Sequence, residues 1–123
     1  MSIEFLKEES ASAVSSLTTI TASATATGFG EIAKESNKAT SIIVNYIYPA
    51  PSIDAVAESR LTALEASMGR LGAQLVQRDR SQVQRCMDEF AANRKKAKSK
   101  QERFHAAGIY ALCLMTCFVS VKV

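Results

Sequence analysis

The residues of this chain that could carry chemistry are three cysteines, Cys86, Cys113 and Cys117, and a single histidine, His105. One histidine excludes a metal site built on a histidine cluster, and it leaves few schemes for general acid–base catalysis. Cys113 and Cys117 are four residues apart and share one face of a helix, from which they do not easily bridge each other. Their spacing also lacks the further ligands of a zinc site. We therefore expect no catalytic residue, no cofactor and no metal ion.

The cysteine count also bears on the compartment of the protein. An odd number of cysteines favours free thiols and a reducing environment. Residues 1–9 are acidic and have no apolar stretch of the kind found in a secretory signal peptide. Both features favour a cytoplasmic location for the N-terminal part of the chain.

Gly28, Gly30 and Ala33 match the G-x-G-x-x-A fingerprint of dinucleotide-binding proteins. That fingerprint needs a buried strand before it and a βαβ unit around it. Here a stretch rich in Ser, Thr and Ala precedes the glycines, and no second strand follows. We interpret the glycines as a break between two helices. Asp88 and Glu89 are interpreted as part of a solvated helix face, so the chain is predicted not to be an enzyme.

A basic tract, which we call the basic collar, occupies residues 94–103. It contributes much of the excess positive charge of the chain, whose formal net charge is +3. Three interpretations stay open: a solvated helix face, a juxtamembrane anchor for anionic lipid, and phosphate contacts with nucleic acid. No nucleic-acid recognition motif surrounds the tract, and the chain has no Trp for base stacking. The cations of the collar are Arg94, Lys95, Lys96, Lys98, Lys100 and Arg103.

The collar is followed directly by an apolar segment, residues 104–121, without a fixed charge. As a helix the segment would be about 27 Å long, which is close to the thickness of the hydrocarbon core of a bilayer. The basic flank would keep the N-terminal part in the cytoplasm. The many small and weakly polar residues favour the other interpretation, a helix or strand buried in a protein core or an oligomer interface. The abrupt change from basic to apolar residues favours the membrane.

The elements that must position these residues begin with a Ser/Thr/Ala-rich region, residues 1–48. Its larger side chains recur at helical spacing, and Gly28 and Gly30 mark the end of a first helix. The stripe of that helix consists of Ile3, Leu6, Ala13, Leu17, Ile20 and Ala24, with Ser10 as its polar member.

A second helix is predicted before the prolines, although residues 42–48 are β-branched and aromatic enough to form a strand. Pro49 and Pro51 then end the element, because residues before proline avoid the α region. The stripe of the second helix consists of Ile32, Ser36, Ala39, Ile43 and Tyr46.

The clearest pattern lies in residues 52–93, which are predicted to form one amphipathic, coiled-coil-like helix of forty or more residues with Ser52 as its N-cap. A heptad seam runs along its first half and skips, with Arg78 and Gln82 on the seam. It resumes in a shifted frame at Val76, Val83, Met87 and Phe90. The seam is predicted to associate with another copy or another helical protein, or to pack on the chain's own N-terminal helices. It consists of Leu61, Leu64, Met68, Leu71 and Leu75.

The sequence therefore predicts an all-α protein with N-terminal helical segments, a long central helix and a C-terminal apolar helix. The layout resembles that of tail-anchored proteins in general, an architecture that transfers no functional residue. The first functional hypothesis is a small, non-enzymatic, tail-anchored membrane protein that self-associates or recruits a partner. The alternative is a soluble helical structural or assembly protein, of the virion or secretion-apparatus type, whose C-terminal segment is buried between subunits. A basic accessory protein that associates with nucleic acid is the weaker alternative.

Overall fold

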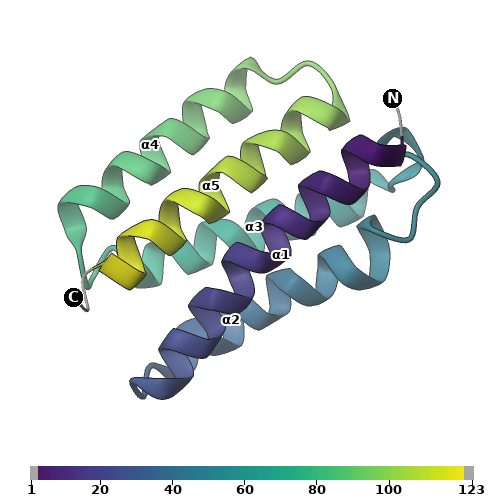
Figure 1. The fold of residues 1–123 in the computed structure, drawn as a ribbon. Coiled ribbons are helices and arrows are strands. Elements are labelled where there is room, and N and C mark those ends of the chain that lie inside the picture. Colours follow the sequence, from purple (N-terminus) through teal and green to yellow (C-terminus); the bar gives the residue numbers. More distant parts are fainter. Residues whose placement is uncertain (1–2, 121–123) are drawn as a thin grey trace.

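The computed structural model describes the backbone of residues 3–120 and the side chains of residues 4–119. Over that range the chain is all-helical, as predicted, and its consecutive helices run up and down in a bundle (Figure 1). Helix α5 lies between α1 and α4, and the two termini lie at opposite ends of the bundle. The elements are α1 (Ile3–Ala26), α2 (Gly30–Ile42), the π-helix η1 (Ile43–Ile47), the 3-10 helix η2 (Ile53–Ala55), α3 (Glu58–Leu75), α4 (Arg80–Lys96) and α5 (Lys100–Ser120).

Helix α1 has the predicted stripe. Every member of the stripe with a described side chain is at most 2% exposed, including Ser10, while the burial of Ile3 lies outside the described side chains. The helix ends where predicted, because Gly28 adopts a φ of 81°, a conformation that glycine enters without strain. The amides of Gly28 and Phe29 donate to the carbonyls of Thr25 and Ala24, which is the Schellman pattern of helix ends.

Residues 42–48 are helical, but the predicted stripe is wrong at its last position. Ile47 is fully buried, whereas Tyr46 is 46% exposed. The cause is η1, in which the amide of Tyr48 donates to the carbonyl of Ile43, five residues back. A π-turn holds one more residue than an α-turn, so it moves the next core position by one residue. Within α2, the stripe member Ser36 is buried and donates from Oγ to the carbonyl of Leu17 in α1, at 2.7 Å.

The prediction of one central helix is wrong. The chain forms two antiparallel helices, α3 and α4, which are separated by a turn at residues 76–79. Asp79 caps α4 by accepting a hydrogen bond from the amide of Gln82, while the amides of Arg78 and Asp79 bond the carbonyl of Leu75 at the end of α3. A local side-chain cap competes with continuation of the helix, which explains why the chain turns here.

Two further predicted boundaries also move. Ser52 is extended and precedes η2 without a side-chain cap, and α3 begins only at Glu58, after Ala57. A second turn at residues 97–99 separates α4 from α5. There Ser99 accepts a hydrogen bond from the amide of Glu102, and the Glu102 carboxylate accepts one from the amide of Lys98. This reciprocal capping starts a new helix inside the predicted collar.

Most of the apolar segment lies in α5, and its Val121 lies outside the described residues. Its buried residues form the inner face of that helix. Among the described residues, no helix is long and apolar enough to cross a membrane. The prediction of a tail-anchored, membrane-located protein is therefore wrong. The apolar side chains pack instead on the chain's own helices α1, α3 and α4. The buried members are Phe104, Ala106, Ala107, Tyr110, Ala111, Leu114, Cys117 and Phe118.

The heptad seam of α3 lies in the same core. Leu61, Leu64, Met68, Leu71 and Leu75 are each at most 1% exposed within the single chain. In the shifted frame, Val83 is buried, and Val76, Met87 and Phe90 pack partly buried against the core. The periodicity therefore reflects burial within the chain. The association of this seam with another molecule stays a prediction.

Helices α3, α4 and α5 meet closely at Gly72. A Cβ placed on Gly72 would lie 1.8 Å from the hydroxyl oxygen of Tyr110, so only glycine leaves room for that ring. The Tyr110 ring stacks on Phe90, with centroids 4.4 Å apart and planes 4° from parallel. Burial raises the pKa of Tyr110 to about 12.

The π-turn predicts a contrast between neighbouring residues. Ile47→Ala should lower the free energy of unfolding by about 2–5 kcal/mol, because it opens a cavity in the core. Tyr46→Ala should cost about 1 kcal/mol or less, mainly the cation–π contact of Tyr46 with Arg60, whose guanidinium lies 3.4 Å from the ring centroid. Urea unfolding followed by circular dichroism measures both values. A larger loss for Tyr46→Ala would contradict the π-turn.

The contact at Gly72 predicts a second contrast. Gly72→Ala should destabilise the protein by about 1–3 kcal/mol, since Tyr110 must move. Gly69→Ala is the matched control in the same helix, because nothing lies within 4 Å of its added Cβ. That control should stabilise the protein by about 0.5–1 kcal/mol through helix propensity. Equal effects of the two changes in thermal unfolding would exclude the close contact.

Candidate functional site

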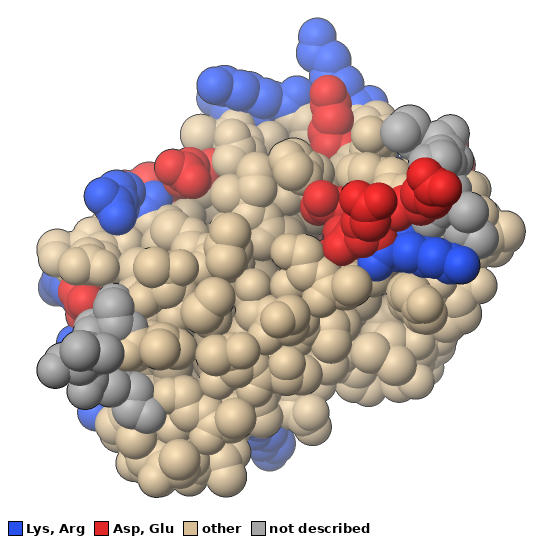
Figure 2. Space-filling model, viewed as in Figure 1, with Lys and Arg blue, Asp and Glu red and all other residues tan. Residues whose placement is uncertain are grey.

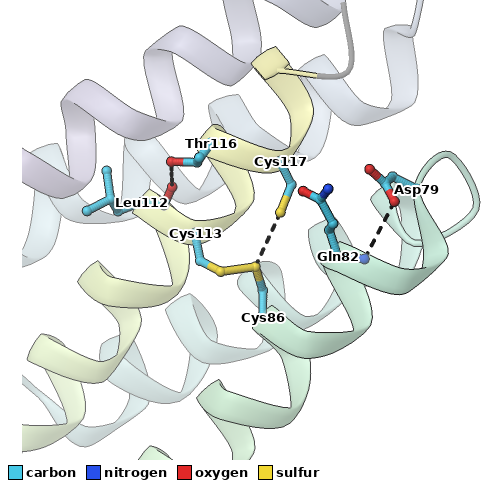
Figure 3. Close-up of a disulfide and its surroundings, with 7 residues drawn as sticks. All are labelled: Asp79, Gln82, Cys86, Leu112, Cys113, Thr116 and Cys117. Atoms are coloured by element: carbon cyan, nitrogen blue, oxygen red, sulfur yellow. Dashed lines mark hydrogen bonds between the residues drawn. A yellow bond between two sulfur atoms is a disulfide. The ribbon is translucent and has the colours of Figure 1, made fainter.

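The three cysteines come together between α4 and α5 (Figure 3). Cys86 of α4 forms a disulfide with Cys113 of α5, with Cα atoms 5.8 Å apart. The Sγ atom of Cys117, one turn further along α5, lies 3.6 Å from the Sγ atom of Cys86. All three sulfur atoms lie within 4.8 Å of one another. Cys86 and Cys117 are buried, and Cys113 is half-buried.

This cluster corrects the prediction of free thiols at Cys86 and Cys113. Cys113 and Cys117 share one face of α5 and do not bridge each other, as their spacing predicts. The disulfide was missed because its cysteines are 27 residues apart. Along one continuous helix that separation is about 40 Å, and only the turn between α4 and α5 reduces it to bonding distance.

Cys117 also borders a small cavity of about 140 Å³ at the end of the bundle. The cavity is almost wholly apolar, with Arg78 and Asp79 as its charged members. Burial raises the pKa of the Cys117 thiol, and the charge of Asp79 adds to that rise, while Arg85 opposes it. Around neutral pH Cys117 is therefore a protonated thiol beside a disulfide. The remaining lining residues are Phe29, Leu75, Val83 and Phe118.

The basic collar is divided by the turn between α4 and α5. Arg103 is only 8% exposed, and it bonds the Glu65 carboxylate through Nε and Nη2 at 3.2 and 2.8 Å and the Glu58 carboxylate through Nη1. These bonds raise the pKa of Arg103 and hold the pKa of Glu58 below its usual range. Arg94 reaches Glu65 at 2.7 Å, and the Lys100 ammonium donates to the carbonyls of η2 and Val56.

Three of the six cations of the collar therefore bond to an element of the bundle other than the one that carries them. The other three, Lys95, Lys96 and Lys98, are exposed. The collar is thus not one continuous basic surface. Sequence spacing gave no indication of Glu58 and Glu65 as partners, because they lie 45 and 38 residues from Arg103.

A second polar cluster joins α2 to α3. The Glu35 carboxylate accepts hydrogen bonds from the Ser67 hydroxyl at 2.6 Å and from Arg70 Nε at 3.2 Å. Burial by itself would raise the pKa of Glu35, but the bonds from Ser67 and Arg70 together outweigh it and lower the pKa. Like the Arg103 cluster, this one holds two helices together.

The single histidine lies in a groove of about 500 Å³ between the first turns of α1 and the α4–α5 turn. Its Nδ1 lies 3.1 Å from the Glu9 carboxylate of α1. The His105 side chain is 55% exposed. Phe5 and Ile109 give the groove an apolar wall, and Lys96 lies at its edge. The pair joins α5 to α1 at the surface.

Comparisons of the chain with protein-family models, with curated proteins and with solved structures found no match. The class of the protein therefore follows from its own architecture. It is an up-and-down helical bundle whose last two helices are bridged by a disulfide, with a third cysteine in contact. Its most buried ion pair, Arg103 with Glu65, connects helices that are distant in the sequence.

The division of the collar predicts unequal effects of removing its cations. Arg103→Ala should lower the free energy of unfolding by about 1–3 kcal/mol, because it removes two hydrogen bonds from the largely buried Glu65 carboxylate and leaves Arg94 as its ion-pair partner. Lys98→Ala, the control on the exposed side, should change it by less than about 0.5 kcal/mol. Chemical unfolding of the two variants measures the difference. Similar small effects would mean that Arg103 is solvated like its neighbours.

Proposed function

We propose that this protein is a non-enzymatic helical structural or assembly protein that packs against a second copy of itself through the outer face of α1. The observation that carries the proposal is an uncharged helix face that continues into an apolar groove with an unsatisfied hydroxyl.

The outer face of α1 has no charge between Ser10 and Gly30. Small residues occupy the exposed positions at helical spacing, namely Ala11, Ser15, Thr18 and Ala22. The front of the bundle, where α1 lies, is free of charged side chains over most of its area, and the charges gather along its upper and left edges and over the first turns of α1 (Figure 2). Small side chains let the backbone of a second helix approach closely.

The threonine hydroxyl groups of α1 are already satisfied within the helix. Thr18 donates to the carbonyl of Val14 at 2.8 Å, and Thr19 donates to that of Ser15 at 2.8 Å. Thr21, Thr25 and Thr27 repeat the pattern one turn back. A group that is hydrogen-bonded before association loses little when water leaves, so this face is dehydrated at low free-energy cost.

The N-terminal half of the face continues into a groove of about 280 Å³ between α1 and η1. Ala11 and Val14 line one side, and Val44 and Tyr48, each 47% exposed, line the other. Ser10 also lines the groove, and it is 1% exposed with no hydrogen-bond partner for Oγ. A buried hydroxyl without a partner costs about 1–3 kcal/mol, which a polar atom of a docked chain would recover.

A second copy is the occupant that the charges favour. The chain is basic overall, so most faces of two copies repel each other, whereas two uncharged α1 faces do not. A face that meets itself about a twofold axis needs only to be complementary to itself, and small residues in a helical stripe meet that condition. Nucleic acid is less well supported as a partner, because Arg94, Lys100 and Arg103 are used inside the bundle.

The non-enzymatic part of the proposal is supported by what the ionisable groups do. Glu35, Glu58 and Glu65 each accept hydrogen bonds from another helix. The His105 ring contacts Glu9 across the α1–α5 boundary. Groups held in such pairs stabilise the bundle and are not directed at a common substrate position.

Sedimentation equilibrium of the full chain tests the proposal. Wild type should be a dimer, and Ala11→Arg and Ala22→Arg should each convert it to a monomer, because a buried charge would lie in the interface. Ala91→Arg, an exposed alanine of α4, is the matched control and should leave the dimer intact. Circular dichroism should be the same for all four proteins, since arginine is a good helix former.

Two results would contradict the proposal. If wild type is a monomer at the highest concentration that stays in solution, association with itself is excluded. If wild type is a dimer that both α1 variants retain, the interface lies elsewhere.

A further inference from the structure

The arrangement of the three sulfur atoms matches the spacing of metal-bound thiolates. Zinc–sulfur bonds are about 2.3 Å long, so neighbouring sulfur atoms around a tetrahedral ion lie about 3.8 Å apart. Here the Cys86 and Cys117 Sγ atoms are 3.6 Å apart, and no pair in the cluster exceeds 4.8 Å. The Cys86 and Cys117 sulfurs are thus already at that spacing, and reduction of the disulfide frees the Cys86 and Cys113 sulfurs to separate to it.

The disulfide alone does not account for the cluster. Bridging α4 to α5 needs only Cys86 and Cys113. Cys117 adds a third sulfur, one helical turn from Cys113 and directed at the same Cys86 (Figure 3). Cys86 therefore faces two sulfurs of α5, and a small apolar side chain at position 117 would fill the core equally well.

We propose that, once the disulfide is reduced, Cys86, Cys113 and Cys117 together bind one soft, thiolate-preferring metal ion, Cu(I) or Zn(II). Thiolate ligands select these ions over hard cations such as Mg²⁺ and Ca²⁺. Three sulfurs complete the shell of a three-coordinate Cu(I) ion, whereas Zn(II) requires a fourth ligand. The cavity beside Cys117 has room for a water molecule, which could supply that ligand.

The two states exclude each other. A dithiol or phosphine reductant supplies two electrons to the Cys86–Cys113 bond, and two protons from water complete the two thiols. Metal binding then releases the thiol protons of all three cysteines as the metal–sulfur bonds form. In reverse, an oxidant such as a peroxide takes two electrons from Cys86 and Cys113, is reduced to water, and the new disulfide releases the metal. The redox state of one pair thus decides whether the site exists.

The proposal is tested on the full chain, reduced with a phosphine, freed of metal and kept without oxygen. Zn²⁺ and Cu(I) are titrated separately against a chromophoric chelator of known affinity. Cd²⁺ is used in addition, because thiolate ligands give it a charge-transfer absorption in the ultraviolet. Reduced wild type should bind one equivalent, and the chain with its disulfide intact, which has only one thiol, should not compete.

The deciding variant is Cys117→Ala, which leaves the disulfide pair intact and adds no polar atom to the core. This variant should bind the metal more than about tenfold more weakly than wild type. Tenfold is the smallest effect typical of losing an outer-shell partner alone. Ser67→Ala, a buried change remote from the sulfurs, is the control and should bind like wild type. If Cys117→Ala binds as tightly as wild type, or reduced wild type binds no stoichiometric metal, the proposal is wrong.

If reduction partly unfolds the bundle, circular dichroism still tests the proposal. Restoration of helix by one equivalent of metal in wild type but not in Cys117→Ala would support the site, because metal binding then drives folding. Reduced wild type that stays unfolded with metal present would overturn it.

Discussion

The chain reverses direction between Leu75 and Arg80, where the carboxylate of Asp79 caps the helix that follows. Without that reversal α3 and α4 would form one rod, and α5 would extend away from α1 instead of packing against it. The contact of Tyr110 with Gly72 and the ion pair of Arg103 with Glu65 both join parts of the chain on opposite sides of this turn. One capped turn is therefore the condition for the whole C-terminal half of the core.

The reversal also changes what the charges do. In a continuous helix the cations of the collar would point into solvent around the helix axis. In the bundle, Arg94 and Arg103 converge on Glu65, and Lys100 closes η2 against the start of α5. In the sequence, the clustered positive charge suggests a surface for lipid or nucleic acid. In the bundle, part of it forms ion pairs and hydrogen bonds between elements of the same chain.

The two regions that we propose for interaction with other molecules lie on different helices. The outer face of α1 between Ser10 and Gly30, together with η1, is uncharged. Removing water from this face costs little free energy, and the face is suited to packing against the same face of a second copy. The sulfur cluster lies between α4 and α5 and responds to reduction. Because the two regions share no residue, an assembly through α1 and a metal bound by the cysteines are compatible in one molecule.

The sequence by itself determined which residues of α1 and α3 are buried, where the first helix ends, and that the chain is all-helical. Burial at helical spacing and the positive φ of Gly28 are local properties, so a pattern of a few turns is enough to predict them. Two cap signals were also present, Asp79 three residues before Gln82 and Ser99 three residues before Glu102, and they mark the turns that the heptad pattern concealed.

Only the tertiary structure decided that Ile47 and not Tyr46 enters the core, that the apolar C-terminal segment packs on α1, α3 and α4, and that Cys86 finds Cys113. A π-turn shifts the register of every residue after it, and an apolar helix looks the same in sequence whether lipid or protein covers it. Contacts between residues far apart in the chain depend on the direction taken at each turn, which no local spacing encodes.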